Sequence, residues 1–89
     1  MRSTNRLLLS ALLSGLSDAI SRNDEAKAYR YRTRIGLIAR NHFETSLVIS
    51  DALGQLLLAS DGWLATKAAE RFEVGQQVLE LVERVSDLL

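Results

Sequence analysis

The chain has 89 residues, of which 47% are hydrophobic, with no cysteine, no proline and eleven basic against eleven acidic residues. Its length fits one domain over residues 1–89, and the missing cysteines exclude disulfides and zinc–thiolate sites and are typical of a reducing compartment, so we expect a cytoplasmic protein. Abundant leucine, alanine, glutamate and arginine favour helices, and we predict an all-α protein.

The first predicted helix covers residues 4–21, where apolar residues recur at helical spacing: Leu9, Leu12, Leu13, Leu16 and Ile20. Residues 1–19 also resemble a secretory signal, because two arginines precede a leucine-rich run. The run is shorter than the roughly 20 apolar residues that a membrane-spanning helix needs. We interpret the segment as a core helix, with the secretory signal as the alternative.

The second predicted helix is long and covers residues 24–59. The stretch "SRND" interrupts the preceding helix, and Asn23 or Asp24 can cap the next one. No strong stop signal follows before "SDG" at residues 60–62, so the helix would be about 54 Å long at a rise of about 1.5 Å per residue. A break near Asn41 is the competing interpretation.

Two apolar stripes run along this predicted helix. The first alternates steps of three and four residues, the spacing of a coiled-coil seam, through Ile35, Ile38, His42, Thr45, Ile49, Ala52, Leu56 and Ala59. The second contains Ala39, Phe43, Ser46, Ser50, Leu53 and Leu57. The first helix is too short to cover both stripes, so we expect a second copy or another helical protein to bind there. The predicted interface comprises Ile35, Ile38, His42, Phe43, Ile49, Leu53, Leu56, Leu57 and Trp63.

The third predicted helix covers residues 63–88 and folds back along the second as an antiparallel hairpin, with Phe72, Gly75, Leu79 and Val82 on its apolar stripe. Trp63 would pack at the hairpin end. The expected architecture is therefore an elongated three-helix arrangement, with a short first, a long central and a long third helix, completed by dimerisation.

The charges divide along the chain. Residues 1–45 hold eight Lys and Arg against four Asp and Glu, whereas residues 46–89 hold three against seven. In the predicted hairpin, Asp87 would lie near Arg34 and Glu80 near Arg40. We therefore expect the acidic third helix to neutralise the basic segment, through exposed pairs worth about 0–1 kcal/mol each.

The stretch "YRYRTR" at residues 29–34 interleaves arginines with aromatic residues, as nucleic-acid-binding segments do. On a helix, Arg30 and Arg34 lie on one side, while Arg32 and Arg40 lie on the other, so the four do not form one face that follows phosphates. We interpret them as solvated flanks of a core stripe. A nucleic-acid-binding regulator that uses Arg30, Arg32, Arg34 and Arg40 is the alternative.

The sequence offers little catalytic chemistry. It has one histidine, its five glycines are scattered singly, and no carboxylate spacing is typical of a metal site. His42 falls in the predicted seam, where we expect a structural polar layer. We predict no catalytic, metal-binding or cofactor-binding residue. The expected function is that of a small, non-enzymatic bacterial adaptor, co-chaperone or anti-activator that binds helix to helix. A membrane-surface protein that inserts its first helix is the second alternative.

Overall fold

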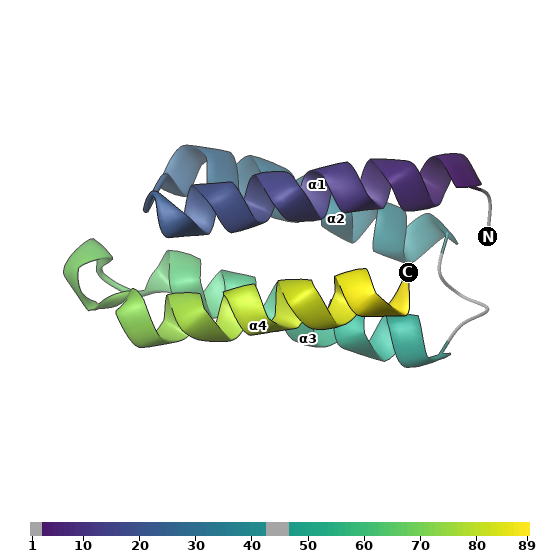
Figure 1. Cartoon of the computed structure of the whole chain (residues 1–89). Helices are drawn as coiled ribbons and strands as arrows, with labels where there is room; N and C mark the ends of the chain where they lie inside the picture. The colour runs from purple at the N-terminus through teal and green to yellow at the C-terminus, as the bar shows by residue number, and fades with distance from the viewer. Residues whose placement is uncertain (1–2, 43–46) are drawn as a thin grey trace.

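The described part of the chain folds into four α-helices and one short 3₁₀ turn (Figure 1). The computed structural model describes residues 3–42 and 47–89, and the side chains of residues 6–40 and 47–89. The helices are α1 (Ser3–Ser21), α2 (Glu25–His42), α3 (Leu47–Ala65) and α4 (Phe72–Leu88), and the 3₁₀ turn covers Ala68–Glu70. No residue in the described ranges lies in a β-strand, so the predicted all-α class is confirmed.

The connection from α1 to α2 follows the sequence prediction. α1 coincides with the first predicted helix to within one residue, and it ends where "SRND" begins. Asn23 has a φ of 54°, in the left-handed region that asparagine tolerates better than most residues. The carboxylate of Asp24 accepts a hydrogen bond from the backbone N–H of Lys27 at 3.2 Å, so Asp24 caps α2 as expected.

The predicted continuous helix over residues 24–59 is wrong. α2 ends at His42, α3 begins at Leu47, and the two helices pack side by side. Arg32 and Asp61 would be about 44 Å apart along one straight helix, yet Arg32 Nε lies 2.7 Å from Asp61 Oδ1. Two shorter helices can bury their apolar stripes against each other, which one long helix cannot do. The competing break near Asn41 agrees with the end of α2.

The predicted turn at "SDG", and with it a third helix starting at residue 63, is also wrong. α3 continues through residues 60–62 because the two polar side chains find partners within the fold. Ser60 is buried, and its hydroxyl donates to the carbonyl of Leu56 at 2.8 Å. Asp61 pairs with Arg32. The chain instead reverses after Ala65, through the 3₁₀ turn, and enters α4 at Phe72.

The four helices form an antiparallel bundle with extents of 39 × 19 × 19 Å. The α1–α2 hairpin packs on the α3–α4 hairpin, so that α1 adjoins α2 and α4, and α3 adjoins the same two helices (Figure 1). α2 and α4 therefore lie diagonally across the bundle. The three-helix arrangement predicted from the sequence is replaced by two hairpins of similar length.

The core lies along the axis of this bundle. α1 contributes the leucines predicted for its apolar stripe, and α4 contributes a stripe at steps of three and four residues: Gly75, Val78, Val82 and Val85. Phe72 was expected on this stripe but is 79% exposed. Where α1 crosses α2, a Cβ atom on Gly15 would collide with the ring of Tyr31, so a larger residue would have to displace that ring.

Candidate functional site

Most residues of the predicted partner interface belong to the core of the single chain. Their side chains are buried within the bundle: Ile35, Ile38, Ile49, Leu53, Leu56 and Trp63. Leu57 is partly buried and packs against the same core. The side chains of His42 and Phe43 lie outside the described residues, as do Thr45 and Ser46. A partner that binds this fold without opening it therefore has to contact other residues.

The arginines of α2 divide into Arg32, which forms an ion pair with a described carboxylate, and three that do not, whereas the helical spacing had grouped Arg40 with Arg32. Arg32 turns toward α3, where its Nε and Nη2 donate to the two carboxylate oxygens of Asp61 at 2.7 and 2.9 Å. Arg30, Arg34 and Arg40 are exposed and form an ion pair with none of the described carboxylates. The predicted pairing of Arg34 with Asp87 and of Arg40 with Glu80 is wrong, because α2 and α4 lie diagonally.

The outward side of α2 combines these arginines with apolar groups. Tyr29 is 63% exposed and Leu37 is 53% exposed. At about 100° per residue, seven exposed residues of α2 fall within roughly 140° of one another. We call this surface the α2 face: Ala26, Tyr29, Arg30, Thr33, Arg34, Leu37 and Arg40.

Two shallow hollows follow the α2 face. One, of about 580 Å³, is lined by six α2 residues from Glu25 to Arg34 and by Leu64 of α3. The other, of about 410 Å³, lies between α2 and α3 and is lined by α2 residues up to Arg40 and by Ser50, Gly54 and Leu57. Together they line the length of α2 from Glu25 to Arg40.

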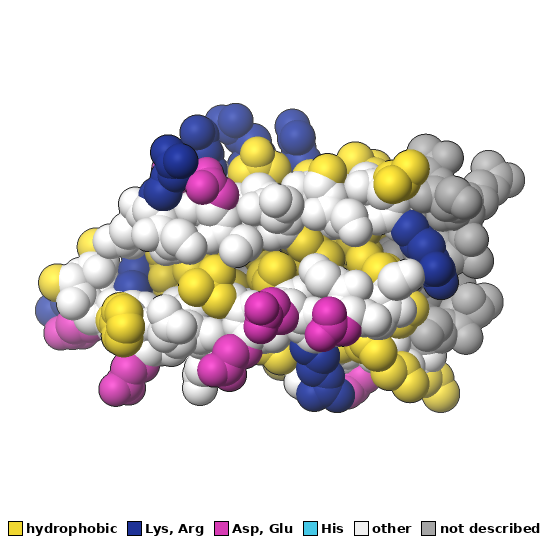
Figure 2. Space-filling model, in the orientation of Figure 1, with side chains coloured by type: hydrophobic (Ala, Val, Ile, Leu, Met, Phe, Trp, Pro, Cys, Tyr) yellow, Lys and Arg dark blue, Asp and Glu magenta, His cyan; other side chains and the backbone are white. Residues whose placement is uncertain are grey.

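The acidic residues gather elsewhere. α4 exposes Glu73, Glu80, Glu83 and Asp87, with Arg84 as the basic residue of the same helix. Figure 2 shows several Lys and Arg side chains along the edge formed by α1 and α2, and most of the visible Asp and Glu side chains on the other side of the molecule. The net charge of zero thus conceals an uneven distribution of charge over the surface.

A buried arginine, Arg71, lies at the end of the bundle where the chain passes from α3 to α4. Arg71 is 6% exposed. Its Nε donates to the carbonyls of Trp63 and Thr66, both at 2.8 Å, and its Nη2 donates to the carbonyl of Leu64 at 3.2 Å. The guanidinium carbon lies 4.2 Å from the centre of the Trp63 ring. These carbonyls belong to the last turn of α3 and the residue after it, so Arg71 supplies donors that the helix end lacks.

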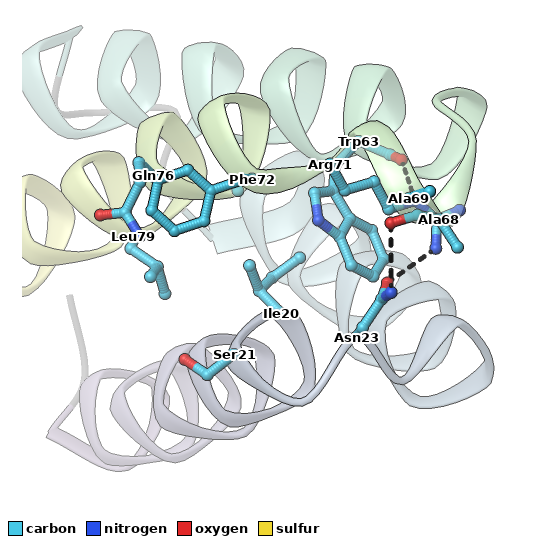
Figure 3. Close-up of a pocket in the computed structure, with 11 residues that line it drawn as sticks. Ile20, Ser21, Asn23, Trp63, Ala68, Ala69, Arg71, Phe72, Gln76 and Leu79 are labelled. Carbon is cyan, nitrogen blue, oxygen red and sulfur yellow. Dashed lines mark hydrogen bonds between the residues drawn. The ribbon is translucent and has the colours of Figure 1, made fainter.

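Arg71 also joins the two hairpins. Its Nη1 donates to the side-chain oxygen of Asn23 at 3.0 Å, and Asn23 Nδ2 donates to the carbonyl of Ala68 at 3.3 Å (Figure 3). The carboxylate of Glu25 lies 3.5 Å from Nη2. We call Asn23, Trp63 and Arg71 the Arg71 cluster. An adjoining pocket of about 370 Å³ extends between α1 and α4 to Gln76 and Leu79.

Arg71 was not among the residues predicted from the sequence, although a signal was present. It lies four residues before Gly75 and so continues the stripe of Gly75, Val78, Val82 and Val85 by one further step. An arginine on the buried stripe of a helix indicates a buried guanidinium that needs several acceptors. Every nitrogen of this guanidinium already contacts an oxygen of the chain. The Arg71 cluster therefore stabilises the fold and is not a candidate ligand site.

The first helix and possible metal ligands add little to the site. The leucines of the apolar stripe of α1 lie in the core, which leaves Leu7 and Leu8 exposed. In the described parts of the chain, no helix combines the length and the apolar character needed to cross a membrane. Within the same ranges, no three His, Asp or Glu side chains are grouped closely enough to hold a metal ion.

Comparison with known proteins returned no match. No protein-family model, no curated protein and no solved structure matches the chain.

Proposed function

We propose that the chain is a non-enzymatic protein–protein interaction module of the adaptor, co-chaperone or anti-activator type, which acts by binding helices. The distribution of exposed apolar side chains carries this proposal. Among the described side chains, eight large apolar ones are exposed, and only Phe72 of these lies on α4. The other seven lie on α1, α2 and α3: Leu7, Leu8, Tyr29, Leu37, Leu47, Val48 and Leu58. Because the four helices already enclose a core, these side chains are available to a partner.

Photo-crosslinking in the cell that makes the protein tests this function. A benzoylphenylalanine residue would replace Leu37 on α2, Leu58 on α3 or, as the matched control, Glu80 on α4. We expect the first two positions to crosslink to a helical segment of a partner, and the α4 position to give no product. Equal labelling from all three positions, or none from any, would contradict the proposal.

A second copy of the chain is one partner in this proposal. On α3, Leu47 is 83% exposed and Leu58 is 74% exposed, and a Cβ on Gly54 or Gly62 would meet no atom within 4 Å. We expect a dimer at micromolar concentration by analytical ultracentrifugation, weakened by Leu58→Glu. A monomer at every concentration would remove the second copy and leave other helical proteins as the partners.

A nucleic-acid-binding regulator is the second candidate function. It is favoured by the exposed Arg30, Arg34 and Arg40, which form no ion pair with a described carboxylate, and by the exposed ring of Tyr29. The acidic surface of α4 opposes it, because phosphates are repelled from that side. Retention on immobilised duplex DNA, with a strong dependence on salt, would favour this candidate.

A further inference from the structure

We propose that the α2 face binds an amphipathic helix of another protein whose polar flanks are acidic. This inference rests on the proposed function and adds to it the site and the chemistry of the partner. It is carried by three properties of α2: uncompensated positive charge, an exposed apolar ridge and the hollows beside that ridge.

The positive charge of the α2 face is not neutralised within the described chain. On α3, Arg32 donates to both carboxylate oxygens of Asp61, and Asp51 accepts a hydrogen bond from Gln55. The carboxylates of α4 lie diagonally across the bundle from Arg30, Arg34 and Arg40. Carboxylates of a partner would therefore meet three exposed guanidinium groups without having to break an ion pair first.

The apolar ridge has the spacing of a helix-binding surface. Tyr29, Thr33 and Leu37 follow one another at intervals of four residues, so the two large side chains are separated by about 12 Å along α2. Arg34 and Arg40 lie about 60° to either side of Leu37, and Arg30 lies on the same side as Arg34. A helix with an apolar stripe and acidic residues on both flanks matches this order of groups.

The hollows distinguish this partner from the other candidates. They lie beside Tyr29 and between α2 and α3, and Leu64 and Leu57 contribute apolar lining. An amphipathic helix can place apolar side chains in such hollows and carboxylates beside the arginines. A second copy offers the acidic helix α4, but the apolar stripe of that helix is buried in its own bundle. Nucleic acid offers phosphates and bases but no aliphatic side chains.

Fluorescence anisotropy with a designed peptide tests the proposal. The probe is a labelled helical peptide with leucine at heptad positions a and d and glutamate at e and g, and the control peptide has glutamine in place of glutamate. We expect the acidic peptide to bind more tightly than the neutral one. The combined variant Arg30→Gln, Arg34→Gln and Arg40→Gln should raise the Kd for the acidic peptide about tenfold at low salt, less at high salt.

Matched variants locate the binding surface. Leu37→Ser should raise the Kd about fivefold, since Leu37 loses apolar contact. Arg84→Gln and Phe72→Ser, both on α4, change an arginine and an exposed apolar residue away from the α2 face. They should leave the Kd within about twofold of that of the unmodified protein. Circular dichroism of each variant would verify that the fold is intact.

Three results would overturn the inference. If Leu58→Ser weakens peptide binding and Leu37→Ser does not, helices bind on α3, so the proposed function stands and the α2 face is the wrong site. If the acidic peptide does not bind but duplex DNA does, and the arginine variant abolishes that binding, the nucleic-acid function replaces both proposals. If anionic vesicles bind and the peptide does not, the partner is a membrane surface.

Discussion

The Arg71 cluster and the α2 face contain the same kind of side chain in opposite situations. Arg71 follows the open carbonyls at the end of α3, and each nitrogen of its guanidinium contacts an oxygen of the chain. Arg30 and Arg34 project from the middle of α2, where the backbone carbonyls are already bonded, and Arg40 projects from its last turn without a described ion pair. Arg71 is thus committed to folding, whereas the arginines of the α2 face remain free for intermolecular contacts. Substitutions in the two regions should therefore differ in their effect on the free energy of unfolding.

The largest effect is expected for Arg71→Leu. This change leaves the carbonyls of Trp63, Leu64 and Thr66 without these donors, and it removes the tie to Asn23. We expect the free energy of unfolding, measured by urea denaturation, to fall by about 3 kcal/mol or more.

Arg84→Leu on the exposed side of α4 is the matched control for this variant. It should change the free energy of unfolding by less than about 0.5 kcal/mol. Similar losses from the two substitutions would mean that burial and hydrogen bonding do not distinguish Arg71 from a surface arginine.

A smaller effect is expected at Asn23, whose side-chain oxygen accepts a hydrogen bond from Arg71. Asn23→Gly introduces a residue that also tolerates the φ of 54°, but it removes both side-chain hydrogen bonds of Asn23. Thermal unfolding should show a loss of about 1–2 kcal/mol. Asn23→Ala should cost about 1 kcal/mol more, because alanine is strained at positive φ. Equal losses would show that the left-handed backbone contributes nothing.

The sequence predicted the parts of this fold that depend on local signals. The bounds of α1, the interruption at "SRND" and the cap at Asp24 are all encoded within a few residues of where they act. The separation of α2 from α3 was missed, because the steps of three and four residues from Ile35 to Leu56 continue across residues 43–46 without a change of period. Hydrophobic spacing alone does not show whether a stripe faces another chain or a later part of its own.

The remaining errors concern residues whose partners are distant in sequence. Ser60 and Asp61 are typical turn residues, but Asp61 pairs with Arg32, which lies 29 residues earlier. Arg71 reaches Asn23 over 48 residues. The α2 face was only half predicted. The separation of Arg30 and Arg34 from Arg32 was correct, but Arg40 was grouped with Arg32, and α4 was expected beside α2 although it lies diagonally across the bundle.

Arg32→Gln should have a modest effect on the free energy of unfolding, smaller than that of changes in the Arg71 cluster and larger than that of changes in the α2 face. The ion pair with Asp61 has two hydrogen bonds, but its side chains are 29% and 51% exposed, so water screens it. We expect a loss of about 0–1 kcal/mol that shrinks as salt is added. Asp61→Asn should give a similar loss, and the double variant should lose less than the sum of the two. Additive losses in this double-mutant cycle would mean that the pair does not contribute to stability.

The smallest effect on stability is expected for the combined variant Arg30→Gln, Arg34→Gln and Arg40→Gln. Glutamine has nearly the helix propensity of arginine, and none of the three arginines forms an ion pair with a described carboxylate. Arg30 and Arg34 are four residues apart on α2, where like charges repel, so their removal should offset any loss of side-chain packing.

We expect the free energy of unfolding of this combined variant to stay within about 0.5 kcal/mol of the original value at low and at high salt. Urea denaturation at two salt concentrations is the measurement, with Arg32→Gln as the variant that should respond to salt. A loss above about 1 kcal/mol that disappears in high salt would mean that the chain's own carboxylates neutralise these arginines. The α2 face would then be a solvated flank of the bundle, and the charge argument for an acidic partner would fail.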